Sequence, residues 1–352
     1  MPAQRIAVVP GDGIGAEVTA AARAVLDAVC ARHRIDLTYD SFNWSCRRYA
    51  ETGSMMPRDA IETLRAYDAV LLGAVGWPGV PDHVSLWGLL IPIRRAFRQY
   101  ANVRPVRVFE GVESPLTTAR AGKVDLVVVR ENVEGEYSEI GGRLNRGFPD
   151  EMAVQEAVFT RVGVERIARH AFELARTRRR RLTSATKSNG IVHTMPFWDE
   201  VVAEVAADYP DVEWESELID ALAAKVVLEP SRFDVIVASN LFGDILSDLT
   251  AAVAGSIGIA PSANLDPTHT YPSMFEPVHG SAPDIAGKGL ANPVGAVWSA
   301  TLMLEHLGHE AAGDDVLRAI ETCMRDPATR TPDLGGDATT DQVTQRLVDL
   351  IS

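Results

Sequence analysis

Apolar strand-like segments alternate along this chain with helix-like segments, and this alternation restricts the fold more than any other feature. The strand-like segments are short and nearly continuous in Val, Ile and Leu, as expected of strands buried on both faces. The alternation predicts an α/β fold with a largely parallel core sheet. We expect strands at Arg5–Pro10, Asp68–Leu72, Val124–Arg130, Arg181–Thr186 and Phe233–Ser239, and helices at Ala16–Ala31, Val164–Arg176, Pro196–Ala207, Phe242–Gly255 and Pro293–Leu307.

Length and charge limit the classes of function. The 352 residues suffice for two domains or one large α/β unit. A formal net charge of −14 disfavours nucleic acid as a partner, because phosphate binding needs a basic face. We interpret the run Arg178–Arg181 as a solvated approach to a strand.

No stretch of about 18 apolar residues predicts a membrane span, and no secretory segment precedes the first strand. Cys30, Cys46 and Cys323 lack CxxC spacing, which favours a reducing compartment, so we expect a cytoplasmic protein.

A glycine-rich turn follows the first expected strand. Gly11, Gly13 and Ala16 match the G-x-G-x-x-G/A pattern of dinucleotide-binding Rossmann folds, and Asp36 has about the spacing of the ribose-binding acid. A tight turn between a strand and a helix explains the same glycines without any ligand. The motif alone leaves both interpretations open.

Two aspartates stand at helical spacing in the segment NLFGDILSD. Asp244 and Asp248 are four residues apart and therefore share one helix face. Hard cations such as Mg²⁺ or Mn²⁺ bind such carboxylates and remove their mutual repulsion. A solvated acidic first turn, favoured by the helix dipole, accounts equally well for the spacing.

Three arginines lie at the boundaries of expected elements. They are Arg94, Arg104 and Arg130, and Arg130 ends a strongly apolar strand, where α/β sheets bind their ligands. Guanidinium groups suit carboxylates, although each arginine taken alone fits a surface ion pair as well. Together with a metal site they predict a dicarboxylate pocket.

Two further segments are candidates for function. The Gly- and Pro-rich stretch from Phe275 to Gly289 predicts a long loop, which in a compact domain is usually functional, and its N–H groups suit a pyrophosphate. Residues 136–154 are polar, Gly-rich and weakly alternating, so they predict either a projecting hairpin or a surface loop.

Together these segments resemble the isocitrate, 3-isopropylmalate and tartrate dehydrogenase family. The resemblance covers almost the whole chain through GDGIG, ENVEGEY, TKSNG, NLFGDILSD and EPVHGSAPDIAGKGLANP. It implies the fold of that family, with two domains and a central mixed, largely parallel sheet, and not the Rossmann fold. The implied division is a discontinuous large domain (about 1–101 and 255–352), a small domain (about 102–254) and an arm (about 136–154) that interlocks two subunits.

The resemblance also implies a homodimer with shared active sites that bind NAD and Mn²⁺ or Mg²⁺. Asp244 and Asp248 would bind the metal with Asp220 of the partner subunit. Lys187 of the partner subunit would accept the hydroxyl proton, and Tyr137 would act as acid on the product enol. Whether a monovalent cation such as K⁺ is needed stays open. The residues implied for substrate binding are Arg94, Arg104, Arg130, Trp87 and Leu90, and those implied for NAD binding are Glu276, His279, Gly280, Ser281, Ala282, Asp284 and Asn292.

Within this family the segments SLWGLL and KSNGI resemble the tartrate and D-malate branch. Isopropylmalate enzymes usually carry an acidic residue in place of Trp87 and a β-branched residue in place of Gly190. We therefore expect NAD-dependent oxidation of a 2-hydroxy dicarboxylic acid, either D-malate to pyruvate and CO₂ or tartrate. The alternative within the family is 3-isopropylmalate dehydrogenase. A Mg²⁺-dependent phosphotransferase or phosphatase is the alternative from another class, but the chain lacks a P-loop lysine motif.

Overall fold

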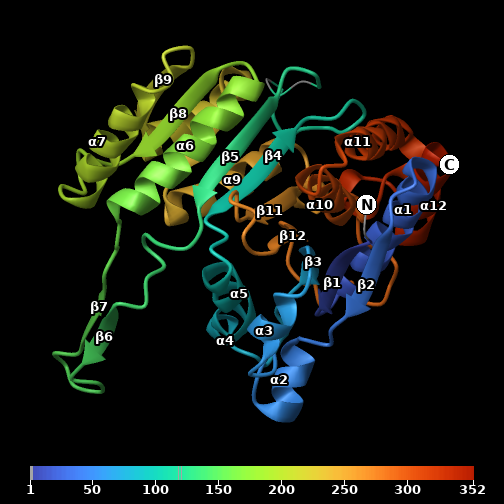
Figure 1. Ribbon diagram of the computed structural model, residues 1–352, viewed down its shortest axis with the longest axis horizontal. Helices are drawn as coiled ribbons and strands as arrows, with labels where there is room; N and C mark the ends of the chain where they lie inside the picture. Colours follow the sequence, from blue (N-terminus) through green and yellow to red (C-terminus); the bar gives the residue numbers. More distant parts are fainter. Residues whose placement is uncertain (1–2, 118, 120) are drawn as a thin grey trace.

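A computed structural model describes residues 3–117, 119 and 121–352 (Figure 1). It has a ten-stranded sheet in the order β2-β1-β3-β12-β11-β4-β5-β10-β8-β9, and a separate two-stranded hairpin of β6 and β7. The strands are β1 (Gln4–Gly11), β2 (Leu37–Ser41), β3 (Ala69–Ala74), β4 (Ala101–Arg107), β5 (Asp125–Glu131), β6 (Gly141–Leu144), β7 (Met152–Gln155), β8 (Arg181–Thr186), β9 (Glu213–Leu218), β10 (Val235–Ala238), β11 (Pro261–Leu265) and β12 (Ser273–Pro277).

The sheet is mixed. Strands β2, β1, β3 and β12 run parallel at one end, and β5, β10, β8 and β9 run parallel at the other. Between the two ends, β11 is antiparallel to both β12 and β4, and β4 is antiparallel to β5. The predicted fold class, a central mixed and largely parallel sheet that is not a Rossmann fold, is confirmed.

The expected helices and strands are all present, with ends shifted by at most three residues. Helices α6 and α9 both contact β5, and α1 and α10 both contact β3 (Figure 1). The helices are α1 (Gly15–His33), α2 (Cys46–Thr52), α3 (Ala60–Leu64), α4 (Asp82–Ser85), α5 (Ile91–Ala96), α6 (Arg161–Thr177), α7 (Thr194–Ala206), α8 (Ile219–Leu228), α9 (Asn240–Val253), α10 (Val294–His306), α11 (Glu310–Arg325) and α12 (Thr340–Ile351). A π-helical turn, Leu86–Leu90, joins α4 to α5, and 3₁₀ turns lie at Pro230–Arg232, Ile257–Ile259, Pro327–Thr329 and Pro332–Leu334.

Both faces of the sheet are buried, which explains the continuous apolar strands. In β1, Ile6 and Val8 belong to the large core with α1, whereas Ala7 and Val9 face a second cluster around Trp44. Side chains alternate between the two faces of a strand, so a strand covered on both sides must be apolar at every position. No helix among the described residues is long and apolar enough to cross a membrane.

The glycine turn after β1 allows the chain to pack closely against the loop that follows β12. Gly13 has a φ of 56°, a left-handed conformation that favours glycine. A Cβ on Gly13 would collide with the carbonyl oxygen of Ser281, in the long loop after β12. The backbone N–H of Ile14 donates to that same oxygen at 2.9 Å. The tight-turn interpretation therefore accounts for the motif that resembled a Rossmann fingerprint.

Residues 136–154 project from the body as a hairpin, at the lower left of Figure 1. Strands β6 and β7 pair in antiparallel fashion and are exposed along their whole length. This settles the choice between hairpin and loop in favour of the hairpin.

The domain division predicted from the sequence stays a prediction. Strands from residues 1–101 and 255–352 occupy one half of the sheet, and those from 102–254 occupy the other. The expected boundary at residue 101 falls on the first residue of β4, and the sheet continues across it.

Candidate active site

A cavity of about 220 Å³ gathers many of the predicted site residues between the two halves of the sheet. Its walls come from β3, the π-helical turn, α5, β4, β5, α9, β12, the loop after β12 and the segment that carries Tyr137. The predicted residues that line it are Leu90, Arg94, Arg104, Arg130, Tyr137, Asp244, Glu276, His279 and Gly280, and Gly73, Ala74, Val75 and Leu86 join them. Trp87, Lys187, Asp220, Asp248, Ser281, Ala282, Asp284 and Asn292 do not line this cavity.

The three predicted arginines converge on the cavity, and each is at most 8% exposed. Arg104 donates to the Ser247 hydroxyl at 2.6 Å and lies 3.4 Å from the Asp248 carboxylate. Burial lowers the pKa of Arg104, but a guanidinium stays charged at neutral pH. The pocket is therefore locally cationic, although the whole chain is strongly acidic.

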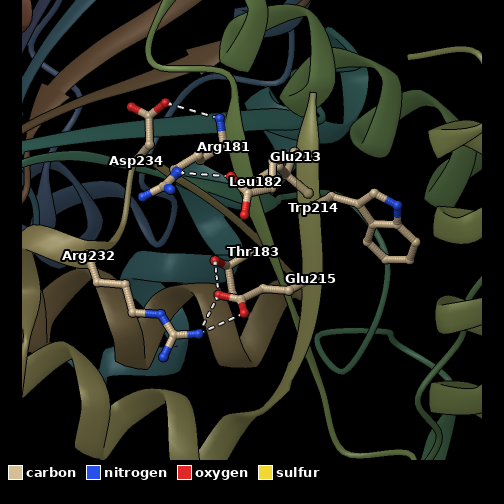
Figure 2. A pocket seen from close by; sticks show the side chains of 8 residues that line it. All are labelled: Arg181, Leu182, Thr183, Glu213, Trp214, Glu215, Arg232 and Asp234. Atoms are coloured by element: carbon tan, nitrogen blue, oxygen red, sulfur yellow. Dashed lines mark hydrogen bonds and ion pairs between the residues drawn. The ribbon is translucent and has the colours of Figure 1, made fainter. Parts of the chain in front are cut away.

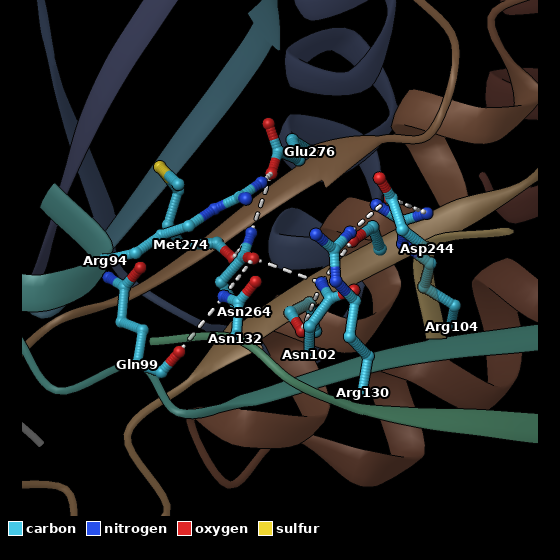
Figure 3. A network of polar contacts seen from close by, with 12 residues as sticks. Arg94, Gln99, Asn102, Arg104, Arg130, Asn132, Asp244, Asn264, Met274 and Glu276 are labelled. Atoms are coloured by element: carbon cyan, nitrogen blue, oxygen red, sulfur yellow. Dashed lines mark hydrogen bonds and ion pairs between the residues drawn. The ribbon is translucent and has the colours of Figure 1, made fainter. Parts of the chain in front are cut away.

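Arg130 is fixed by the start of α9. It donates to Asn240 Oδ1 at 2.7 Å and forms an ion pair with Asp244 (Figure 3). Gly243 permits this approach, because a Cβ there would lie 2.6 Å from Arg130 Cβ. Asn240 was not predicted as a site residue, although its place at the start of the NLFGD motif was a usable signal.

Arg94 rests on a buried polar network shown in Figure 3. It donates to Glu276 Oε1 at 2.7 Å, and Asn264 donates to the same oxygen at 2.8 Å. Asn264 in turn accepts from Asn102 at 3.0 Å and from Asn132 at 2.9 Å. Glu276 thus lies in β12 and fixes Arg94, and its expected contact with the cofactor stays a prediction.

Asp244 and Asp248 lie on one face of α9, as their spacing predicted. Burial alone would raise the pKa of Asp244, but Arg130 and Arg104 outweigh it and the pKa is lowered. Burial raises the pKa of Asp248, and the Arg104 charge offsets this only in part. Two carboxylates beside open space suit a hard divalent cation. The described residues bring no third Asp, Glu, His or Cys to them, so this chain alone offers an incomplete ligand set.

Tyr137 lies beside these aspartates. Its hydroxyl donates to Asp244 Oδ2 at 2.9 Å. Burial and then the Asp244 charge raise the pKa of the tyrosine, so the hydroxyl keeps its proton. This is the state that a proton donor requires.

Lys187 and Asp220 form a separate pair outside the cavity. Lys187 directly follows β8, Asp220 lies in the first turn of α8, and their charged groups are 2.9 Å apart. The hydrogen bond from Lys187 lowers the pKa of Asp220. Neither residue joins the pocket of its own chain.

Trp87 lies in the π-helical turn, where its ring packs under the Arg95 guanidinium at 4.9 Å. Leu90 and Leu86, from the same turn, line the cavity instead. Leu90 can therefore contact a substrate in the cavity, as expected, whereas the indole of Trp87 packs against Arg95.

The long loop after β12 passes beside the glycine turn and ends at α10. Ala282 has a φ of 40°, an uncommon conformation for a residue with a Cβ that is frequent at functional sites. Asp284 is exposed and therefore accessible to a ligand. Asn292 is buried, donates to Asp333 at 3.1 Å and accepts from the N–H of Val294, the first residue of α10, at 3.0 Å.

A second cavity, of about 150 Å³, is lined by residues of the paired strands β8 and β9 together with Arg232 and Asp234 (Figure 2). Its charged side chains neutralise one another. Arg232 pairs with Glu215 at 2.7 Å and Arg181 with Glu213 at 3.1 Å. With its charges already paired, this cavity offers little for a reaction.

Comparisons with known proteins identify the family of this chain. The isocitrate/isopropylmalate dehydrogenase family model matches residues 5–351. A probable tartrate dehydrogenase/decarboxylase of Bacillus subtilis is 56% identical over 97% of this chain and 96% of its own. The D-malate dehydrogenase (decarboxylating) of Escherichia coli is 53% identical over 100% of this chain and 99% of its own. Isocitrate dehydrogenase from Methylococcus capsulatus has a TM-score of 0.89 at 35% identity, over 99% of both chains. The chain belongs to the isocitrate/isopropylmalate dehydrogenase family.

Proposed function

We propose that this protein catalyses NAD- and divalent-metal-dependent oxidation of a small 2-hydroxy dicarboxylic acid. The reaction is the oxidative decarboxylation of D-malate to pyruvate and CO₂, with tartrate as a second substrate. The observation that carries the proposal is the meeting of three buried guanidinium groups, Asp244 and Tyr137 at one small cavity, with Asp248 paired to Arg104 beside it. Relatives at 53% identity named for D-malate and for tartrate support this choice of substrates.

The arginines would bind the two substrate carboxylates. Arg94 and Arg104 lie on different walls of the cavity, and Arg130 lies between Tyr137 and Asn240. Bidentate arginine–carboxylate pairs fix orientation as well as charge. Because these guanidinium groups are already desolvated, a dianion entering the cavity meets strong and pre-organised partners.

Asp244 and Asp248 would hold Mn²⁺ or Mg²⁺ together with Asp220 of the partner subunit. Such a cation, when bound, lowers the pKa of a coordinated hydroxyl and stabilises negative charge on the neighbouring oxygen. Asp248 is suited to this task because its side chain is 61% exposed and its tie to Arg104, at 3.4 Å, is long.

The two proton transfers would fall to Lys187 of the partner subunit and to Tyr137. Lys187 would accept the hydroxyl proton, a task that a lysine performs when nearby cations or burial lower its pKa. Tyr137, protonated and fixed by Asp244, would protonate the enol left after CO₂ departs.

The loop after β12 would bind NAD, which accepts the hydride. Its backbone N–H groups suit the pyrophosphate. The exposed Asp284 would accept hydrogen bonds from the free adenosine ribose and repel a 2′-phosphate.

A homodimer would complete the site. Apolar side chains are exposed along the hairpin, among them Ile140 at 57%, Leu144 at 59% and Phe148 at 67%. An isolated two-stranded hairpin is at best marginally stable, and exposed apolar side chains mark interaction surfaces. Pairing of this arm with a second copy therefore explains both its shape and its composition. The cytoplasmic location expected from the cysteines remains a prediction.

One assay tests the proposal. Adding D-malate to the protein with NAD and Mn²⁺ should raise the absorbance at 340 nm, and pyruvate should form in equal amount. Omitting Mn²⁺ in the presence of a chelator should abolish the signal. If NADH forms with 3-isopropylmalate but not with D-malate, the alternative within the family is favoured. Phosphate release from a phosphate ester, with no NADH formed from any of these acids, would favour a phosphatase.

A further inference from the structure

Arg95 lies at a junction of α5, the π-helical turn and the segment that carries Tyr137. Its Nη2 donates to the Tyr137 carbonyl oxygen at 2.8 Å, and its Nη1 donates to Glu139 Oε2 at 2.5 Å. The guanidinium lies 4.9 Å from the centre of the Trp87 ring. The Arg95 side chain thus contacts Trp87 in the π-helical turn, the proposed proton donor Tyr137, and Glu139 next to the hairpin.

Other contacts around Tyr137 come from the start of α9 and from the hairpin strand β7. Glu136 accepts from the Ser239 hydroxyl at 2.7 Å and from the Leu241 N–H at 3.0 Å, at the start of α9. The Ser138 carbonyl accepts from Gln155 at 2.9 Å. Arg95, in contrast, belongs to α5, which precedes β4 and packs against the π-helical turn. It therefore fixes Tyr137 relative to the helix that also carries Arg94.

We propose that Arg95 is a positioning residue that holds Tyr137 in place for protonation of the enol. This inference rests on the proposed function and assigns to it a residue outside the reacting groups. Arg95 does not itself line the cavity and pairs with neither Asp244 nor Asp248. It reaches the cavity through its bond to the Tyr137 carbonyl, so its effect must pass through Tyr137.

Arg95 holds Tyr137 through the planar geometry of its guanidinium group and not through its ion pair with Glu139. Glu139 is 68% exposed on its side chain, and exposed ion pairs contribute little because water screens them. The bond to the Tyr137 carbonyl is less exposed, and the stacking on Trp87 restricts the guanidinium to one plane. A lysine has three donors, but all are on one nitrogen, so it lacks the planar fork with which two arginine nitrogens reach the two acceptors.

The test separates the protonation step from hydride transfer. Enzyme with Mn²⁺ and without NAD is given oxaloacetate, which loses CO₂ and gains a proton to form pyruvate. Oxidation of D-malate is followed separately as NADH formed in the first turnover. We expect Arg95→Met to slow pyruvate formation from oxaloacetate roughly 10- to 100-fold, because a small misplacement of a reacting group costs that much. First-turnover NADH and the KM for D-malate should change less than about twofold.

Arg65→Met is the matched control. Arg65 also pairs with a glutamate, Glu62, at 3.1 Å, and also stacks on an aromatic ring, that of Tyr271, at 5.1 Å, but its contacts do not include Tyr137. This variant should match the wild type in both assays. Arg95→Lys should recover part of the activity lost in Arg95→Met, and Glu139→Gln should have a small effect.

A double variant gives the decisive comparison. If Arg95 acts through Tyr137, adding Arg95→Met to Tyr137→Phe should cause no further loss. Multiplying losses, or an Arg95→Met enzyme as active on oxaloacetate as Arg65→Met, would overturn the assignment while the proposed function stands. If the wild type forms no NADH from any 2-hydroxy diacid, the proposed function fails, and this inference fails with it.

Discussion

The Lys187 ammonium lies 2.9 Å from the Asp220 carboxylate, away from the cavity that contains Tyr137 and Asp244. The proposed reaction needs Lys187 and Asp220 together with Tyr137 and Asp244, but one chain holds these two pairs in separate places. The metal-ligand set shows the same division, since the described residues form no cluster of three ligating side chains. A second subunit that brings its Lys187 and Asp220 to this cavity would complete both sets.

Mixed dimers test this shared site. Chains with Lys187→Ala and chains with Tyr137→Phe should each be nearly inactive on D-malate. Co-expressed, they should regain about a quarter of wild-type activity, because half of randomly paired dimers are mixed and each holds one intact site. A stable monomer with full activity, or mixtures no better than the single variants, would contradict the arrangement.

Metal binding should depend on α9. Asp248→Asn removes a charge from one proposed ligand while leaving the amide oxygen, so affinity for Mn²⁺ should fall roughly 10- to 100-fold, a loss typical of perturbed metal sites. Mn²⁺ titration followed by electron paramagnetic resonance measures this without turnover. Asp82→Asn, at the start of α4, is the control, and unchanged Mn²⁺ affinity in Asp248→Asn would remove Asp248 from the ligand set.

Residues within one segment were well predicted from the sequence. The spacing of Asp244 and Asp248 placed both on one helix face, and the apolar run before Arg130 placed that arginine near the end of a strand. Such features depend on helix and strand periodicity, which a single sequence carries.

Contacts between distant segments were not predictable in this way. Nothing in the sequence near Arg95 indicates that it reaches Tyr137, which lies 42 positions later. Glu276 was assigned to the cofactor loop, whereas it ends up inside β12 and pairs with Arg94 across 182 positions. Three-dimensional packing decides these partners, and local patterns do not encode it.

Cofactor choice should depend on Asp284. Replacing its carboxylate by the ammonium of Asp284→Lys should raise the ratio of kcat/KM for NADP to that for NAD by about tenfold or more, since like-charge repulsion of a phosphate becomes attraction. Asp36→Lys makes the same charge change at the position that a Rossmann fold would use. An equal shift in Asp36→Lys, or a wild type that uses NADP as well as NAD, would refute the assignment.

Stability should depend on pH through Glu131, which is fully buried after Arg130. Burial raises the pKa of this carboxyl to about 7, although it accepts from the Val133 N–H at 2.8 Å. Because the folded pKa exceeds the unfolded one, the folded state binds more protons between the two values, and the free energy of unfolding falls as pH rises through this window. In Glu131→Gln the free energy of unfolding should not decrease in this way as the pH rises, because the amide does not titrate. Denaturant unfolding at pH 5 and pH 7.5 should show the variant gaining on the wild type at the higher pH, whereas the exposed Glu51→Gln should not.

Substrate choice should depend on Gly190, which follows Lys187 in the segment expected to reach the partner's cavity. A Cβ there would meet only Lys187 atoms at 3.9 and 4.0 Å, so the chain has room for a larger side chain and glycine is not required by packing within the subunit. Leu86 and Leu90 already provide one apolar wall in the cavity.

Gly190→Val should supply a second wall for a branched alkyl group. Packing a methyl group or two is worth roughly 10- to 200-fold in discrimination, so the ratio of kcat/KM for 3-isopropylmalate to that for D-malate should rise within that range. Gly190→Ala should give a smaller rise in the same direction. Trp87 is held under Arg95, so Trp87→Phe should change this ratio much less than Gly190→Val does. Kinetics with D-malate, L-tartrate and 3-isopropylmalate on one preparation decide the matter. A wild type that prefers 3-isopropylmalate tenfold would move the protein to another branch, because the glycine would then not be excluding alkyl substrates.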